Sequence, residues 1–322
     1  MNYRIALLFL IVPILLLEGC AFVNVSLFGQ PRPLEEQRIE GSGDRKIVLV
    51  DLSGFISDKE SGGALRPQPS PVVQVREALQ KAADDPDVAG VILRINSPGG
   101  TVAASDIIHH EIVGFRTRTR IPVYAVITGI GASGGYYAAA GCDEISAHPA
   151  AVTGSIGVLV MKFQITALMD KIGISEQTVK SGAMKDIMSP FRAGTPEENR
   201  LVQGIIDELH GRFIDTVLAR PGNRLSREQV IAVADGRIYT AQQALNAGII
   251  DRVAYLDETI TLMKARAGLD RASIVIYYRP GGYRGTIYSG SPDNVPPVVN
   301  LVNLDLGDLE LLNSSRFLYL WQ

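Results

Sequence analysis

Cysteine and histidine are scarce in this 322-residue sequence, and positive charge is not in excess. Its two cysteines, Cys20 and Cys142, cannot build a disulfide framework, although one bond between them is formally possible. Neither has the nearby Cys or His partners of a zinc site, and no HExxH motif occurs, so we expect no metal. A net charge of -3, with scattered Lys and Arg, argues against nucleic acid as a partner.

The N-terminal apolar run, residues 5–17, is shorter than the roughly 20 residues of a membrane-spanning helix. It follows Arg4 and matches the hydrophobic region of a signal peptide. The run ends in residues 17–20, LEGC, which look like a bacterial lipoprotein box with Cys20 as the lipidated residue, although Glu18 is unusual there. An uncleaved anchor and soluble secretion remain alternatives. All three place the rest of the chain outside the cytoplasm.

The composition along the chain predicts four parts. Residues 1–20 form the signal peptide or lipoprotein anchor, and the charged segment 21–45, with its Pro and Gly, forms a tether. Residues 46–267 form one folded domain, and residues 268–322 form a C-terminal extension with weaker patterning. Because the last residues are apolar, we expect them to dock on their own domain or on a neighbouring subunit.

Continuously apolar strands alternate with amphipathic helices in the first half of the domain. Such strands favour an α/β fold with a parallel sheet covered on both faces, where ligand chemistry gathers at the carboxyl ends of strands. Two glycine-rich breaks, residues 96–100 and 129–135, follow directly after strands. The predicted strands are residues 47–52, 88–95 and 122–128; the predicted helices are 72–83, 105–115, one beginning near Ser133, and later ones capped by Thr195, Ser226 and Thr240.

Ser133 is the candidate nucleophile. It lies between small residues, after a strand and at the start of a helix, where its hydroxyl can be exposed next to free backbone N–H groups. Residues 131–135 also satisfy the G-x-S-x-G pattern, which arises by chance fairly often. A serine in a glycine-rich turn is by default a cap, and it attacks a carbonyl only if a base removes its proton.

Lysine is the better candidate for that base. The four histidines His109, His110, His148 and His210 are poorly placed in the chain for a hydrolase triad. Lys185 lies within residues 181–190, SGAMKDIMSP, where small and apolar neighbours could lower its pKa by desolvation. An ordinary ion pair between Lys185 and a carboxylate is the alternative.

Five ordered blocks of the sequence resemble the signal peptide peptidase A (protease IV) family. By that resemblance Ser133 matches the nucleophile and Lys185 the general base, and Ser155 matches the hydroxyl that orients the lysine. The backbone N–H groups of Gly100 and Gly134 would form the oxyanion hole. The blocks are residues 96–100 (NSPGG), 132–137 (ASGGYY), 153–158 (TGSIGV), 181–190 (SGAMKDIMSP) and 236–251, beginning GRIYT.

The resemblance also implies a fold and an activity. The fold is a Clp-protease/crotonase-like spiral of ββα units, with a mostly parallel sheet flanked by helices. The activity is that of a membrane-anchored serine endopeptidase without metal or cofactor, acting on signal peptide remnants and other unfolded peptides. A homo-oligomer is expected, held at the bacterial cell membrane with its catalytic domain on the extracytoplasmic, periplasmic side.

Three other functions compete with this interpretation. A histidine-dependent α/β-hydrolase esterase would tolerate loss of Lys185 but would need His148 or His210. A crotonase-type acyl-CoA enzyme would share the fold and the oxyanion glycines, yet an exported lipoprotein has no supply of CoA. A non-catalytic scaffold on the same fold would not react with a serine-directed reagent.

Overall fold

A mostly parallel β-sheet forms the centre of the computed structural model, which describes residues 33–60, 68–279 and 317–321. Its strand order is β1-β10-β2-β3-β4-β5-β9, and every neighbouring pair is parallel except β1 with β10. The strands are β1 (Glu35–Gly41), β2 (Lys46–Ile56), β3 (Val88–Thr101), β4 (Val123–Ala132), β5 (Glu144–Ala147), β9 (Arg252–Val253) and β10 (Ser273–Tyr278).

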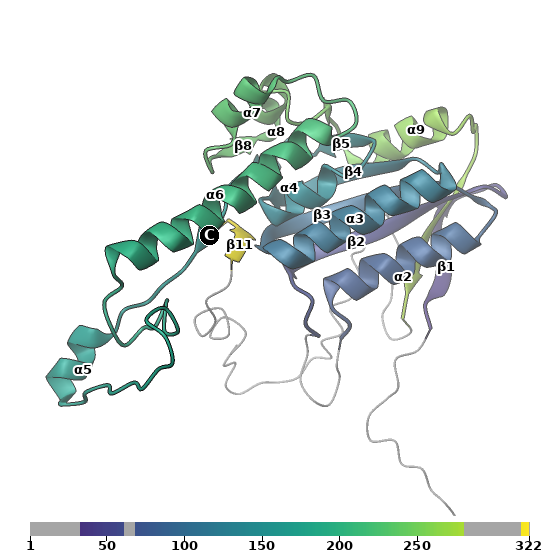
Figure 1. The fold of residues 1–322 in the computed structure, drawn as a ribbon. Helices are drawn as coiled ribbons and strands as arrows, with labels where there is room; N and C mark the ends of the chain where they lie inside the picture. Colours follow the sequence, from purple (N-terminus) through teal and green to yellow (C-terminus); the bar gives the residue numbers. More distant parts are fainter. Residues whose placement is uncertain (1–32, 61–67, 280–316, 322) are drawn as a thin grey trace, which may run out of the picture.

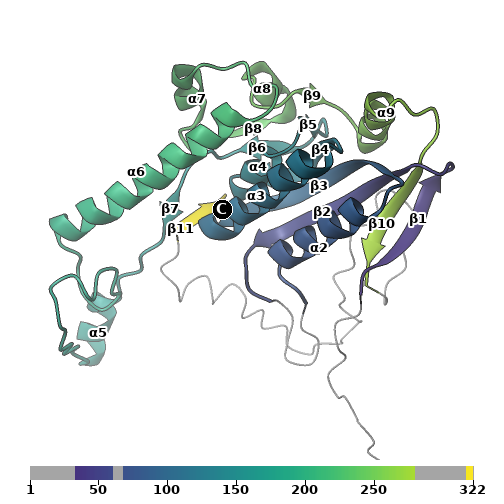
Figure 2. The ribbon, with the colours of Figure 1, turned by 45° about the vertical axis from the view of Figure 1, so that its right-hand side comes forward.

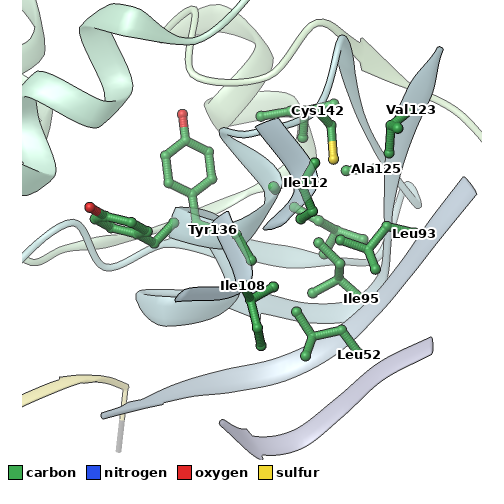
Figure 3. Close-up of a cluster of buried hydrophobic side chains, with 14 of the residues drawn as sticks. Leu52, Leu93, Ile95, Ile108, Ile112, Val123, Ala125, Tyr136 and Cys142 are labelled. Atoms are coloured by element: carbon green, nitrogen blue, oxygen red, sulfur yellow. The ribbon is translucent and has the colours of Figure 1, made fainter. Parts of the chain in front are cut away.

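Helices cover both faces of this sheet, as its continuously apolar strands require (Figure 1). On one face, Leu93 and Ile95 of β3 pack with Ile108 and Ile112 of a covering helix (Figure 3). On the other face, alternate strand residues pack against Met263. The mostly parallel α/β architecture predicted from the sequence is therefore confirmed. The first face is covered by α2 (Pro71–Asp84), α3 (Val102–Thr119) and α4 (Gly134–Ala139), and the second by α9 (Leu256–Arg266).

Short strands and further helices extend the carboxyl ends of β3 and β4. Strand β6 (Val152–Gly154) pairs with the end of β4 and with β8 (Ile238–Thr240). Strand β11 (Phe317–Leu320) pairs with the end of β3 and with β7 (Leu159–Val160). The helices here are α6 (Pro196–Ala219), α7 (Arg227–Val233) and α8 (Ala241–Asn246), and their predicted caps Thr195, Ser226 and Thr240 all form capping boxes.

The structure corrects two predicted boundaries. Residues 35–41 are an edge strand and not part of a tether, and they pair with β10, which lies beyond the predicted domain end at 267. Charged side chains on an edge strand resemble a linker in sequence, because such strands use charge to prevent unwanted pairing. The predicted anchor, including Cys20, falls outside the described residues. Among the helices of the described ranges, none combines the length and the apolarity needed to cross a bilayer.

Residues 161–205, called the arm below, project from the body of the molecule. They contain α5 (Thr166–Ile172) and the first half of α6, and both views show them extending away from the sheet (Figures 1 and 2). The apolar side chains of α6 are buried at Phe213 and Val217 but exposed at Ile205. Several other apolar side chains of the arm are also exposed: Phe163, Leu168, Ile172, Ile174, Val179 and Leu201. Within the described ranges, this apolar surface of a single chain is thus left uncovered.

His109 should make the stability of the fold depend on pH. Burial lowers its pKa from 6.5 to about 4, although the charge of Asp106 opposes the shift. The unfolded chain therefore binds more protons between these values, and the free energy of unfolding falls as the pH drops from 6.5 towards 4. We expect His109 to contribute about 2 kcal/mol of this loss, after allowance for its partial exposure. Urea unfolding at pH 7 and 4.5 should show a smaller loss for His109→Gln than for wild type.

Candidate active site

Ser133 occupies a strained turn between β4 and α4. Its φ of 52° and ψ of -114° lie where residues other than glycine are rare, at a cost on the order of 1–3 kcal/mol. The turn is held by the Ser133 N–H, which donates to the Gly154 carbonyl at 2.8 Å, and by the Tyr137 N–H, which donates to the Ser133 carbonyl. The side chain is buried, and its hydroxyl has no hydrogen-bond partner in the described part of the chain. This strand–turn–helix geometry is that of a nucleophile elbow.

Ser155 lies on the neighbouring strand end, in register with Ser133. Strand β6 runs parallel to β4 and pairs Gly154 with Ala132, so each serine directly follows a paired residue. Ser155 also has a positive φ, of 50°, and its N–H donates to the Arg237 carbonyl at 2.7 Å. The side chain is buried. The fold therefore brings two predicted site residues from separate sequence blocks to one edge of the sheet.

The two glycines predicted for the oxyanion hole lie next to each other. A methyl group built on Gly134 would stand 3.1 Å from the Gly100 nitrogen, so the end of β3 lies against the start of α4. Gly99 has a φ of +107°, and a methyl group on it would stand 2.8 Å from the Gly134 nitrogen. Only glycine fits at this junction. The backbones of Gly100 and Gly134 thus lie close together next to the turn that carries Ser133.

The C-terminal strand β11 lies along these glycines. It is antiparallel to β3, with Tyr319 opposite Gly100, and the Trp321 N–H donates to the Pro98 carbonyl at 2.9 Å. A methyl group on Gly134 would stand 3.1 Å from the Tyr319 carbonyl oxygen. The expectation that the apolar end docks on its own domain is confirmed. Strand β11 thus lies between the end of β3 and β7 as an extended segment.

Lys185 is the predicted site residue that a single chain does not bring to this edge. It is exposed, and its segment between α5 and α6 lies away from β4 and α4 in both views (Figures 1 and 2). Its ammonium makes no ion pair with any side chain in the described ranges, so the alternative of a structural ion pair has no support there.

An ion-pair network fixes the segment that carries Lys185. Arg192 bonds to Asp186 at 2.6 Å and also to Glu198, at the start of α6. Lys180 bonds to Asp186 at 2.6 Å. Hydrogen bonds from Arg192 and Lys180 hold the pKa of Asp186 well below its usual range, and those from Arg192 and the Thr195 N–H lower the pKa of Glu198 to about 2. Asp186, the neighbour of Lys185, is therefore held in place, while Lys185 itself has no ion-pair partner among the described residues.

Histidines near the site have other contacts. His210 Nε2 donates to the Ala234 carbonyl at 2.7 Å, and the residue lines a pocket of about 460 Å³ together with Ser155 and Trp321. His148 Nδ1 accepts from the Ala150 N–H. No group of three or more possible metal ligands occurs among the residues that the structure describes.

Sequence reasoning missed two parts of the site. Gly99 was not distinguished from Gly100, although two consecutive glycines after a strand indicate that backbone from elsewhere approaches closely. The tail was expected to dock, but not in the groove beside Ser133. Its residues 317–320, FLYL, have the composition of a strand but contain nothing that identifies a partner strand.

Comparison with known proteins now identifies the family. Residues 116–270 match the model of peptidase family S49. A protein of Enterococcus faecium named signal peptide peptidase SppA is 33% identical over 79% of this chain and 73% of its own length. A protease of Synechocystis sp. is 40% identical over 70% of this chain and 76% of its own. The solved structure of a membrane-bound stomatin-specific protease is 16% identical, covers 68% of this chain and 85% of its own, and has a TM-score of 0.42. The chain belongs to peptidase family S49, the family of signal peptide peptidase SppA and its serine protease relatives.

Proposed function

We propose that this S49 peptidase is a membrane-anchored endopeptidase that cleaves peptide bonds with Ser133 as nucleophile and Lys185 as general base. The observation that carries the proposal is the buried, unpaired Ser133 hydroxyl in a strained turn, directly before one oxyanion amide and beside the other. Holding a serine in such a conformation lowers stability, and the fold tolerates this where the hydroxyl must face a substrate.

The reaction follows from this geometry. Neutral Lys185 takes the Ser133 proton while the hydroxyl oxygen attacks the peptide carbonyl. The amides of Gly100 and Gly134 donate to the oxyanion, and donors of this kind are worth about 3 kcal/mol each. The protonated lysine then gives its proton to the leaving amine, and water hydrolyses the acyl-enzyme. Ser155 orients the lysine amine from the adjacent strand end.

Lys185 would reach Ser133 of a second copy of the chain. Three observations support this arrangement: the arm projects from its own body, its apolar side chains are exposed, and Lys185 has no ion-pair partner among the described residues. Packing the arm on a neighbour would cover the apolar surface and also strip water from the lysine, which lowers its pKa. A homo-oligomer is therefore part of the proposed active site.

The anchor and the substrates are proposed on the sequence and the family. Residues 1–20, ending in Cys20, would hold the domain on the extracytoplasmic side of a bacterial membrane. The groove that accepts β11 is suited to extended, unfolded peptides, such as signal peptide remnants. Mass spectrometry of the mature N-terminus tests the anchor and should show a lipid on Cys20. The lipid should be absent from the Cys20→Ser variant.

Activity measurements on three variants test the proposed dyad. The wild-type chain should hydrolyse casein and label with a fluorophosphonate, whereas Ser133→Ala should do neither. Lys185→Ala should lose both hydrolysis and rapid labelling, while His210→Ala should keep most of the activity. The reverse pattern, with Lys185→Ala active and His210→Ala inactive, would favour a histidine-dependent hydrolase, for which the presence of His210 and Ser155 in one pocket is the supporting observation.

A further inference from the structure

We propose that Arg192 and Lys180 are positioning residues that keep Lys185 neutral. They bind the Asp186 carboxylate, so that it does not pair with the lysine amine, and their own charges oppose a further positive charge beside them. The inference rests on the proposed function, because it concerns the base of that reaction. One of its two tests needs no catalysis.

Arg192 and Lys180 together occupy both oxygens of the Asp186 carboxylate. Nε of Arg192 donates to Oδ2 at 2.7 Å, and Nη2 donates to Oδ1 at 2.6 Å. The Lys180 ammonium donates to the same Oδ1 at 2.6 Å. These bonds hold the pKa of Asp186 well below its usual range, so the carboxylate stays charged and paired at neutral pH. A carboxylate held in this way by two cations is not available to a third.

Lys185 is the cation that Asp186 would otherwise meet first. The two residues are adjacent in the chain, in a turn where the Lys185 N–H donates to the Gly182 carbonyl at 3.1 Å. A carboxylate within about 4–6 Å of an amine stabilises the charged form of the amine. A charged lysine cannot take the proton of a serine. The contacts of Arg192 and Lys180 therefore explain how a general base can directly precede an aspartate.

Arg192 also ties this turn to the start of α6. Its Nη1 donates to Oε2 of Glu198 at 3.0 Å, and the Glu198 side chain is buried. The same oxygen accepts from the Thr195 N–H at 2.8 Å in the capping box of α6. Because a guanidinium is a rigid planar fork, it holds Asp186 and Glu198 at a fixed separation. The turn that presents Lys185 is thus fixed relative to the helix.

The charges around this turn sum to a positive value. A methyl group built on Gly194 would stand 2.7 Å from the Lys162 nitrogen and 3.7 Å from Oε2 of Glu198, so Lys162 joins the network. The cluster then has three cations and two carboxylates: Lys162, Lys180, Arg192, Asp186 and Glu198. Nearby positive charge favours the neutral form of a lysine, and it acts over a Debye length of about 8 Å at physiological ionic strength.

Other charged groups near Lys185 stay the same in every variant used below. On the arm they are Asp170, Lys171, Glu176, Glu197 and Arg200. On the copy that receives the arm, they are Asp207, His210 and Asp235, which line the pocket containing Ser155, and Arg237, which pairs with Asp235. Because these groups contribute equally to wild type and variants, a shifted pH profile reports the cluster itself.

The pH dependence of kcat/KM tests the role of the cluster. The wild-type value should rise with pH as Lys185 loses its proton. Arg192→Gln removes a cation and releases a carboxylate, and both changes favour the charged lysine. We expect its rising limb to move about one unit to higher pH, with activity recovered at high pH, and the limb of Lys180→Gln to move about half as far.

Two further variants separate charge from structure. Arg192→Lys keeps the charge, so its limb should stay near that of wild type. Adding Asp186→Asn to Arg192→Gln removes the released carboxylate and should return the limb towards wild type. Arg76→Gln, which breaks an exposed ion pair with Glu111 on the body of the molecule, should leave the limb unmoved. If Arg192→Gln and Lys180→Gln lose activity equally at every pH, the cluster has only a structural role and the proposal is wrong.

Competitive acetylation measures the protonation of Lys185 without catalysis. In the full-length Ser133→Ala protein, a trace of acetic anhydride reacts only with neutral amines, and peptide mass spectrometry reports each lysine. Adding Arg192→Gln should make Lys185 about tenfold less reactive on the rising part of its profile, as a shift of one pH unit requires. Lys171, elsewhere in the arm, should react as before. Equal reactivity of Lys185 in both proteins would overturn the proposal.

Failure of the proposed function would give a different result. A wild-type enzyme that neither digests casein nor labels at Ser133, or a fully active Lys185→Ala enzyme, would reject the Ser133 and Lys185 dyad. Acetylation would still decide whether the cluster controls the protonation of Lys185. An active enzyme that depends on Lys185 but shows no shift in Arg192→Gln would reject the role of the cluster alone.

Discussion

A mixture of Ser133→Ala and Lys185→Ala proteins, each inactive alone, should recover about a quarter of the wild-type rate of casein hydrolysis after subunit exchange. In an equal mixture, roughly half of the subunits carry an intact serine, and roughly half of their neighbours carry an intact lysine. Only a site that combines one group from each of two chains can recover activity in this way. The experiment therefore tests directly whether the arm supplies the base to a second copy.

The control for this experiment is a mixture of Ser133→Ala with the double variant that carries both substitutions. It should remain inactive, because no subunit then has an intact serine. Formation of mixed assemblies must be shown by native mass spectrometry. Mixed assemblies without recovered activity, alongside an active wild type, would place the base within the same chain as Ser133 and contradict the proposed contact between subunits.

The sequence predicted best those features that depend on local patterns. The strands around 47–52, 88–95 and 122–128 are continuously apolar because both faces of the sheet are covered, and all three were confirmed. Parallel strands end at the same edge of a sheet. The glycine-rich segments that follow β3 and β4, which contain Gly100 and Ser133, were therefore expected to lie together.

The remaining features depend on contacts that are distant in sequence. Strand β1 was assigned to a tether because charge at an edge strand and charge in a linker look alike, and its partner β10 lies more than 200 residues further on. The apolar face of α6 was visible in the sequence, but nothing in the pattern showed that Ile205 stays uncovered in one chain while Phe213 is buried. Periodicity detects an apolar face without identifying what covers it.

A single methyl group at Gly99 is expected to have a large effect on catalysis. In Gly99→Ala the added carbon would stand 2.0 Å from the Tyr319 carbonyl oxygen and 2.8 Å from the Gly134 nitrogen, both backbone atoms. The φ of +107° also disfavours any side chain. The carbonyl under attack could then no longer approach the oxyanion amides, and we expect the rate of peptide hydrolysis to fall about 10²- to 10³-fold.

A matched control separates this effect from a general loss of stability. Gly211 lies in α6, and a methyl group there meets no atom within 4 Å, so Gly211→Ala should keep full activity and raise the melting temperature slightly. Fluorophosphonate labelling of Gly99→Ala should slow together with hydrolysis, because the phosphonyl oxygen needs the same two amides. A folded Gly99→Ala enzyme that keeps more than about a tenth of its activity would mean that the oxyanion forms elsewhere.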